Sequence, residues 1–394
     1  MKRCYRPIPC PVYAFKALET WLSDCAKEGW LLEKDGFFLG FGSFLPAAPQ
    51  TLRYRLIPAE SRDRDAEPGD EQLELSEKYG WEYVARLKDF YVFRCSDPEA
   101  RELNTDTEVE AYALKPIKKR QRSVLSSSLF YLLVYPQLVT RFCPLLTFIT
   151  MGSLWSLTAL LWGICMVLRE LRAFRYLKST QKALSTGEES PASDWKAERK
   201  RYFSGKMLRT VLVIFLLCGF LRIRSGNALP LEEYNDPLPF ATIKDYAGEG
   251  CRDYALTLSD LGSSINTVEQ RSDFLAPLAV NYNEHAAVRT ADGRLLDGGL
   301  YVDYIELRSP ALAKEALREL YRINRHLRRF TPMEAPALDC DEVQAYTDNT
   351  HFPNLLLRKG NVVARVMFYQ TGAYKLSVEQ WGEIACDRLG TMSN

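Results

Sequence analysis

The chain has 394 residues, a net charge of +1 and 26% charged residues, averages that are typical of a globular protein. These averages conceal a basic middle segment, because residues 118–225 hold 18 Lys and Arg against 5 Asp and Glu, whereas both flanking segments are net acidic. Positive charge beside apolar runs indicates a membrane surface. Nucleic acid is excluded as a direct partner, because the positive charge is interleaved with apolar runs and both flanks are acidic.

Residues 1–117 are predicted to form a cytoplasmic α+β domain. The start of the chain has no apolar run long enough for a signal peptide, so we expect the N-terminus to stay in the cytoplasm. The expected elements are a strand at 3–8, a helix at 12–28, strands at 30–42 and 51–57, a helix at 70–79 and a strand region at 82–95. This βαββαβ-like order predicts a ferredoxin-like sandwich, with one antiparallel sheet and both helices on the same face.

Two short stretches of this domain, KEGW at 27–30 and KYGW at 78–81, repeat at an offset of 51 residues. Each follows an expected helix and precedes a strand-like run that ends in aromatic residues. Glycine adopts the left-handed conformation that ends many helices, so the two stretches are predicted to form the same corner twice. The corner residues are Gly29, Trp30, Gly80 and Trp81. We interpret the tryptophans as core residues, with an aromatic-ligand or RNA platform as the alternative.

Residues 118–224 are predicted to be a membrane segment with three spans, at 123–140, 145–168 and 207–223. A helix needs about 20 apolar residues to cross about 30 Å of hydrocarbon. The second segment has 24 residues without a charge, and four residues connect it to the first, which predicts a tight helical hairpin. The third has a short apolar core, so a buried helix of a soluble domain is the alternative there.

Basic residues predict the orientation of these spans. Ten Lys and Arg lie between residues 169 and 206, which we expect to be a cytoplasmic loop, whereas only Arg141 lies at the tip of the hairpin. Because cytoplasmic loops carry an excess of Lys and Arg, residues 1–122 are also expected inside. Residues 225–394 are then expected to form an extracytoplasmic domain of a multi-pass protein in the cell membrane.

The second span has small residues at intervals of 4, 3 and 4. On a helix these positions share one face, and small residues allow close helix packing in lipid. The stripe consists of Gly152, Ser156, Ala159 and Gly163. We interpret it as a packing face for another span or for a second copy of the chain, with chance spacing as the alternative. No Asp, Glu, Lys or His lies in the middle of a span, which argues against a transporter or channel.

The C-terminal domain is predicted to be α+β. A strand is expected at 299–308, followed by a helix from Ser309-Pro310 to about Leu327. A hairpin is expected at 355–368, turning at residues 359–361. Ser377 and Gln380 form a predicted capping box for a last helix.

Neither a catalytic motif nor a metal or cofactor site is recognised in the sequence. The ten cysteines lack metal-ligand spacing, and the three histidines, His285, His326 and His351, lie far apart. Cys251, Cys340 and Cys386 allow at most one disulfide bond in the C-terminal domain. An arginine-rich run is interpreted as the solvent face of a helix, with an anion or lipid-headgroup site as the alternative. It comprises Arg318, Arg322, Arg325, Arg328 and Arg329.

The N-terminal segment resembles domain-of-unknown-function family 2812. The resemblance rests on EGWLLEK after the first helix, then GFFLGF, LRYRL and EKYGWEYVARLKDFYVFR, with a basic stretch and membrane spans behind. It covers residues 1–115, and a charged, proline-containing insert at 58–70 departs from the family pattern. The resemblance implies a membrane-anchored protein of Gram-positive bacteria, similar to the longer members with a C-terminal extracytoplasmic domain. It also implies that a gene for a PadR-like transcription regulator lies beside the gene for this protein. It implies no catalytic residues.

We therefore expect a non-enzymatic, membrane-anchored sensor or regulator that couples an extracytoplasmic domain to a cytoplasmic interaction domain. Its expected partners are the lipid bilayer, a cytoplasmic protein such as a PadR-like regulator, and a second copy of the chain. The alternatives are an accessory subunit of a membrane transport complex and an unrecognised enzyme. Neither the signal, the protein partner nor the oligomeric state follows from the sequence.

Overall fold

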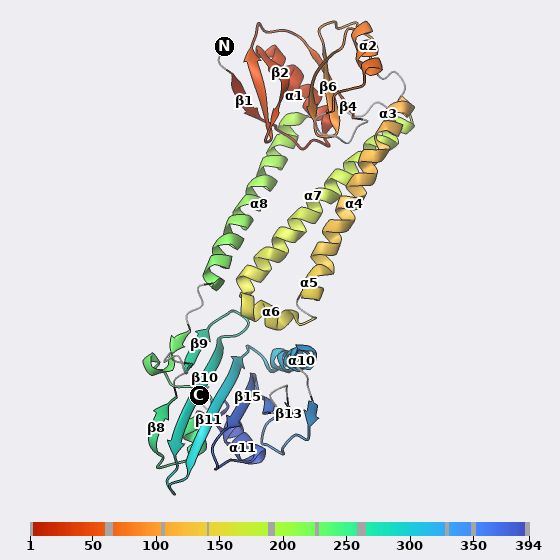
Figure 1. The fold of residues 1–394 in the computed structure, drawn as a ribbon. Helices are drawn as coiled ribbons and strands as arrows, with labels where there is room; N and C mark the ends of the chain where they lie inside the picture. The colour runs from red at the N-terminus through yellow and green to blue at the C-terminus, as the bar shows by residue number, and fades with distance from the viewer. Residues whose placement is uncertain are drawn as a thin grey trace. The chain divides into compact units, whose positions relative to one another are not determined.

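The structure is a computed structural model that describes residues 3–59, 66–103, 107–139, 142–187, 194–224, 228–257, 265–327, 331–347 and 352–390 (Figure 1). The chain divides into two compact units. One comprises Met1–Val134 and Leu160–Ile214, and the other comprises Tyr135–Ala159 and Phe215–Asn394. Each unit therefore contains one terminal domain and part of the helices of the middle segment.

The N-terminal domain consists of two consecutive copies of one β-α-β-β arrangement. The first copy contains β1 (Cys4–Pro7), α1 (Phe15–Lys27), β2 (Trp30–Phe38) and β3 (Phe41–Pro46). The second contains β4 (Arg53–Pro58), α2 (Asp70–Lys78), β5 (Glu82–Leu87) and β6 (Phe90–Cys95). Each copy forms a three-stranded antiparallel sheet, in the orders β1-β3-β2 and β4-β6-β5. The 51-residue sequence repeat therefore corresponds to a structural duplication.

The expected ferredoxin-like topology is wrong, because the domain contains two sheets instead of one. The regions 30–42 and 82–95 each fold into a hairpin; in the first, Leu39 and Gly40 both have positive φ, as in a type I′ turn. The two helices also contact opposite faces of the second sheet. Phe90 of β6 packs with α1, whereas the adjacent Tyr91 belongs to the cluster beside α2. Strand β6 is apolar at successive positions, so both of its faces need cover.

The middle of the chain folds into helices α3 (Thr107–Ala113), α4 (Lys115–Leu133), α5 (Tyr135–Val139), α6 (Pro144–Met151), α7 (Ser153–Ser185) and α8 (Trp195–Arg224). Among the described residues, two helices, α7 and α8, are long and apolar enough to cross a membrane, against the three expected. The first expected span, 123–140, is divided between α4 and α5, and the second, 145–168, between α6 and α7.

The region 169–206, which we expected as the segment between two spans, is largely helical in its described part. Helix α7 continues to Ser185 and α8 begins at Trp195, so most of the basic residues lie on helices. Lysine and arginine are good helix formers, and the apolar residues between them pack on the N-terminal domain. A basic segment between two apolar runs can therefore be helical.

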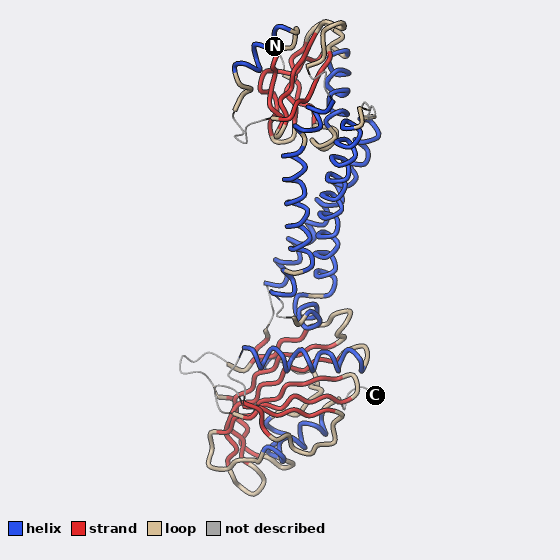
Figure 2. Tube along the Cα trace, turned by 90° about the vertical axis from the view of Figure 1, so that its right-hand side faces the viewer, coloured by secondary structure: helices blue, strands red, loops and turns tan. Residues whose placement is uncertain are grey.

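The C-terminal domain is built on an antiparallel sheet of nine strands with helices on both faces (Figure 2). The strand order is β12-β13-β14-β15-β11-β10-β9-β7, and β8 also pairs with β10. Helix α10 (Pro310–Leu327) packs on one face, and α9 (Ile243–Ala247) and α11 (Val378–Arg388) pack on the other. The strands are β7 (Leu229–Pro230), β8 (Arg252–Leu256), β9 (Thr267–Arg271), β10 (Leu278–Arg289), β11 (Leu295–Glu306), β12 (Thr331–Met333), β13 (Glu342–Thr347), β14 (Pro353–Lys359) and β15 (Val362–Gln370).

Several local signals in this domain act as the sequence predicted. The hydroxyl of Ser309 accepts a hydrogen bond from Leu312 N at 3.3 Å, and α10 begins at Pro310. The capping box of Ser377 and Gln380 starts α11. A disulfide bond joins Cys340 to Cys386, so α11 is linked covalently to the segment before β13.

Candidate functional site

The described residues contain no group of three or more His, Cys, Asp and Glu side chains placed to hold a metal ion. His285 of β10 lies between Tyr301 and Tyr369, whose hydroxyls are 2.9 and 2.6 Å from its two ring nitrogens. Burial lowers the pKa of His285, and both of its ring nitrogens lie within hydrogen-bond distance of a tyrosine hydroxyl in this aromatic cluster on the sheet. The side chain of His326 and all of His351 lie outside the described residues.

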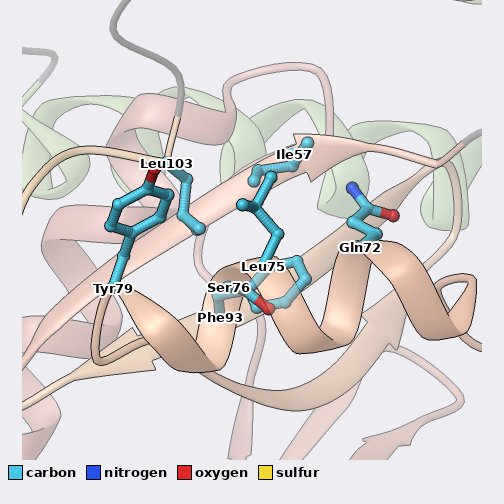
Figure 3. Close-up of a pocket in the computed structure, with 7 residues that line it drawn as sticks. All are labelled: Ile57, Gln72, Leu75, Ser76, Tyr79, Phe93 and Leu103. Carbon is cyan, nitrogen blue, oxygen red and sulfur yellow. The ribbon is translucent and has the colours of Figure 1, made fainter.

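A small depression of about 90 Å³ lies under α2 in the N-terminal domain. Most of its lining is apolar, and the Ser76 hydroxyl already donates to Leu73 O at 2.9 Å. Such a volume holds only a few water molecules, so it does not form a ligand site. Figure 3 shows the lining residues Ile57, Gln72, Leu75, Ser76, Tyr79, Phe93 and Leu103.

The more informative site is the junction of α6 and α7, which we call the elbow and define as residues 142–153. The chain turns there at Gly152, which has φ 90° and no heavy atom within 4 Å of the position that a Cβ would occupy. This left-handed conformation favours glycine and ends α6. The long apolar run 145–168 is therefore two helices, and only the second part belongs to α7.

Glu319 of α10 caps the first helix of the elbow. Its carboxylate accepts hydrogen bonds from Leu145 N at 3.1 Å and Leu146 N at 2.8 Å, and the residue is 1% exposed. The first N–H groups of a helix lack partners within the helix and carry partial positive charge, so a carboxylate stabilises them. Burial raises the pKa of Glu319, although these two hydrogen bonds oppose the shift. Arg322 donates to Phe142 O and holds the same end of the elbow.

Asp273 caps α7 in a similar way. Its carboxylate accepts hydrogen bonds from Ser153 N at 2.7 Å and from the Ser153 hydroxyl. Burial acts to raise the pKa of Asp273, but the hydrogen bonds from Ser153 and Leu275 outweigh it and lower the pKa. Arg271 donates to Thr150 O at 3.1 Å. Two carboxylates and two arginines of the C-terminal domain thus hold both helices of the elbow.

The other half of α7 belongs to the N-terminal domain. Leu177 and Leu184 are buried in the core that α1 and β4–β6 form, and Tyr176 packs edge-on against Phe15. At the start of α8, the Trp195 indole donates to Asp24 Oδ2 at 2.9 Å. Helix α7 is therefore capped by one domain at its first residue and shares the core of the other near its last turns.

The structure divides the predicted small-residue face. Ser156, Ala159 and Gly163 lie on α7, whereas Gly152 lies outside it at the elbow, so its inclusion in the face is corrected. Ser156 is buried, and a Cβ added to Gly163 would lie 2.8 Å from Leu132 Cδ1 of α4. Close packing of α7 on α4 thus occurs at Gly163.

The two Gly-Trp corners occupy equivalent places in the duplicated domain. Gly29 and Gly80 have φ of 82° and 80° and follow α1 and α2. An arginine from the first strand of each copy lies over each indole ring, 5.5 Å from Trp30 and 5.3 Å from Trp81. Trp81 is fully buried and donates to Arg101 O at 2.8 Å, so it is a core residue, and Trp30 is half-buried.

Sequence reasoning missed three residues that fix the helices, namely Gly219 on α8 and two carboxylates of the C-terminal domain. Gly219 of α8 lies directly against the Trp155 indole of α7, which donates to Leu216 O at 3.0 Å. A lone glycine in the apolar run 211–221 was the available signal. Asp273 and Glu319 gave no local signal, because their helix partners are 120 and more than 170 residues away in the sequence.

Comparison with known proteins agrees with the resemblance found in the sequence. Residues 14–126 match the family described as protein of unknown function (DUF2812). The match runs from the start of α1 through both copies of the β-α-β-β arrangement and into α4. No curated protein and no solved structure matches the chain.

Proposed function

We propose that this chain, whose residues 14–126 match the DUF2812 family, is a membrane-anchored, non-enzymatic sensor or regulator. In this proposal α7 couples an extracytoplasmic C-terminal domain to a cytoplasmic N-terminal interaction domain. The observation that carries the proposal is the double engagement of α7. Asp273 caps its first residue, and Leu177 and Leu184 contribute to the N-terminal core. A change of the C-terminal domain that altered the cap would act on a helix that the N-terminal domain also contains.

Exposed apolar side chains on the helices support membrane insertion. On α7 and α8, ten aliphatic residues expose between 44% and 68% of their surface. Exposing this much apolar surface to water is unfavourable, whereas contact with the hydrocarbon of a bilayer is not. These residues are Leu154, Leu157, Leu160, Leu161, Leu168, Leu208, Val211, Ile214, Leu217 and Leu221.

Contacts within each unit support a particular number of membrane crossings. The first turns of α4 contact the same domain as the last turns of α7, since Lys118 is hydrogen-bonded to Gln181 and Leu177 lies in the N-terminal core. The elbow is bound to the C-terminal domain. If α7 crosses the bilayer between these contacts, the chain from α4 to the elbow must cross it as well. We therefore propose three crossings, with α4 and α5 together forming the first.

Cysteine chemistry and charge support an orientation with the C-terminal domain outside. The Cys340–Cys386 disulfide belongs to that domain, whereas Cys10, Cys25 and Cys95 are free, buried thiols of the N-terminal domain. Disulfide bonds persist in oxidising compartments and are rare in the cytosol. Most basic residues of α4, α7 and α8 lie toward the helix ends that contact the N-terminal domain, as the positive-inside rule predicts, whereas Arg222 and Arg224 lie in the last turn of α8.

Reporter fusions test this topology. A periplasm-type alkaline phosphatase reporter should be inactive after Lys182 and active after Asn394, and a fluorescent cytoplasmic reporter should show the reverse. Cytoplasmic signals at both positions would contradict the proposal, because both domains would then lie on one side of the bilayer.

The regulatory role is tested in the native host by transcript profiling. Deletion of residues 226–394 should change a defined set of transcripts, and further deletion of residues 1–117 should abolish that change. Asp273→Ala should reproduce part of the response by uncoupling α7 at its cap. Asp236→Ala is the matched control, because Asp236 is exposed and lies outside the elbow. Unchanged transcription combined with loss of a transport activity would favour an accessory subunit of a transport complex instead.

A further inference from the structure

A shallow depression of about 380 Å³ lies on the surface of the C-terminal domain, between α10 and β13. Its charged lining consists of Arg318, Arg322 and Arg325, which the spacing of four and three residues places on one face of α10. Tyr321 and Gln344 complete the described lining, and none of these described residues carries a carboxylate.

The hydrogen-bond donors of this depression exceed the acceptors that the described residues supply. Arg318 pairs with Glu315 at 3.2 Å on the exposed surface, and Arg322 donates one N–H to Phe142 O. Among the residues that the structure describes, no carboxylate pairs with Arg325. A guanidinium group carries five N–H donors, and adjacent guanidinium groups repel one another unless an anion lies between them. The arrangement is therefore suited to a phosphate group, which accepts such donors in pairs.

Gln344 indicates a second chemical property of the ligand, a hydrogen-bond donor. Its side-chain oxygen is buried and has no hydrogen-bond partner within the described part of the chain. A buried acceptor without a donor is unfavourable, so a ligand that supplies a hydroxyl hydrogen would stabilise the site. A phosphate ester that also carries hydroxyl groups meets both requirements.

The position of the depression indicates the source of that phosphate ester. Arg322 contacts Phe142 at the start of the elbow, and Glu319, on the same helix, caps α6. Directly after the elbow, Leu154 and Leu157 of α7 expose their side chains, in the segment that we place in lipid. The arginines thus lie at the level where phospholipid headgroups would meet the protein.

We propose that the depression binds the phosphoglycerol headgroup of an anionic phospholipid. The inference rests on the proposed membrane insertion of α7 and is independent of the regulatory role. A bound headgroup would contact the same helix, α10, that holds α6 through Glu319. The anionic lipid content of the membrane would therefore act directly on the element that positions the elbow.

Native mass spectrometry of the full-length protein in a neutral detergent tests the proposal. Phosphatidylglycerol, phosphatidylcholine and inorganic phosphate are the three probes. The test variant is Arg318→Ala/Arg325→Ala, which keeps Arg322 at the elbow. The control is Arg289→Ala/Arg294→Ala, which removes the same charge from exposed positions beside the β10–β11 turn.

The wild-type chain should retain phosphatidylglycerol in preference to phosphatidylcholine, and the test variant should bind it at least about tenfold more weakly than the control. Equal affinities of the two variants would overturn the site. Binding of inorganic phosphate as tight as that of the lipid would overturn the lipid assignment and indicate a soluble anion. Because the assay uses detergent, its failure is distinct from a failure of the topology, which the reporter fusions measure separately.

Discussion

Replacing Asp273 with alanine is the sharpest test of how the C-terminal domain holds α7. The carboxylate accepts two hydrogen bonds from Ser153, one from the backbone N–H and one from the hydroxyl, and Ser153 is 2% exposed. A hydrogen bond to a charged group contributes about 1.5–3 kcal/mol, and loss of a helix cap costs about 0.5–2 kcal/mol. Because the two bonds share one carboxylate, we expect about 3 kcal/mol for the pair.

Hydrogen exchange measured by mass spectrometry detects this change in the first turn of α7. A loss of about 3 kcal/mol corresponds to a decrease of roughly 100-fold in amide protection, provided that the first turn opens locally. The expected decrease is confined to peptides that contain residues 153–157. Asp236→Ala should leave their exchange unchanged. Full protection of these amides in Asp273→Ala would show that lipid and neighbouring helices, and not the cap, fix the start of α7.

Acidification provides an independent check of the same contact. The pKa of Asp273 is lowered in the folded chain, so the carboxylate stabilises the elbow above the ordinary aspartate pKa of about 4. This contribution is lost as the pH falls through the lowered pKa. Wild-type protection of the first turn should decrease over that range, whereas Asp273→Ala should show no such dependence.

Three further predictions concern other parts of the chain. Gly219→Ala should destabilise the packing of α7 and α8 by about 1–2 kcal/mol in detergent. The effect should exceed that of Gly163→Ala, because the rigid indole of Trp155 fills the space beside Gly219, whereas the flexible end of a leucine side chain fills the space beside Gly163. Cys386→Ser should lower the free energy of unfolding of the C-terminal domain by about 4 kcal/mol, as expected for opening a 46-residue loop; equal melting curves with and without reductant would contradict this. Burial raises the pKa of Glu284, so the stability of that domain should fall as the pH rises from the ordinary glutamate pKa to the raised one, and Glu284→Gln should flatten this slope in urea titrations.

The sequence by itself determined the features that depend on near neighbours in the chain. The apolar face of α1, the start of α10 at Pro310 and the capping box of α11 all follow from residues within a few positions. The same holds for the duplicated Gly-Trp corners, because a left-handed glycine after a helix is a local requirement. Apolar length alone also indicated that the middle of the chain contains helices long and apolar enough to cross a membrane.

Tertiary structure decided where those local elements end and which of them meet. The run 145–168 is one continuous apolar stretch in the sequence, but α6 and α7 are separate helices that meet at Gly152. Glu319 caps the start of α6, and Asp273 caps the start of α7. Both carboxylates come from distant parts of the chain, so no local pattern reveals them. In the same way, the division of β1–β6 into two sheets depends on which strands pair, and pairing is a property of the folded domain.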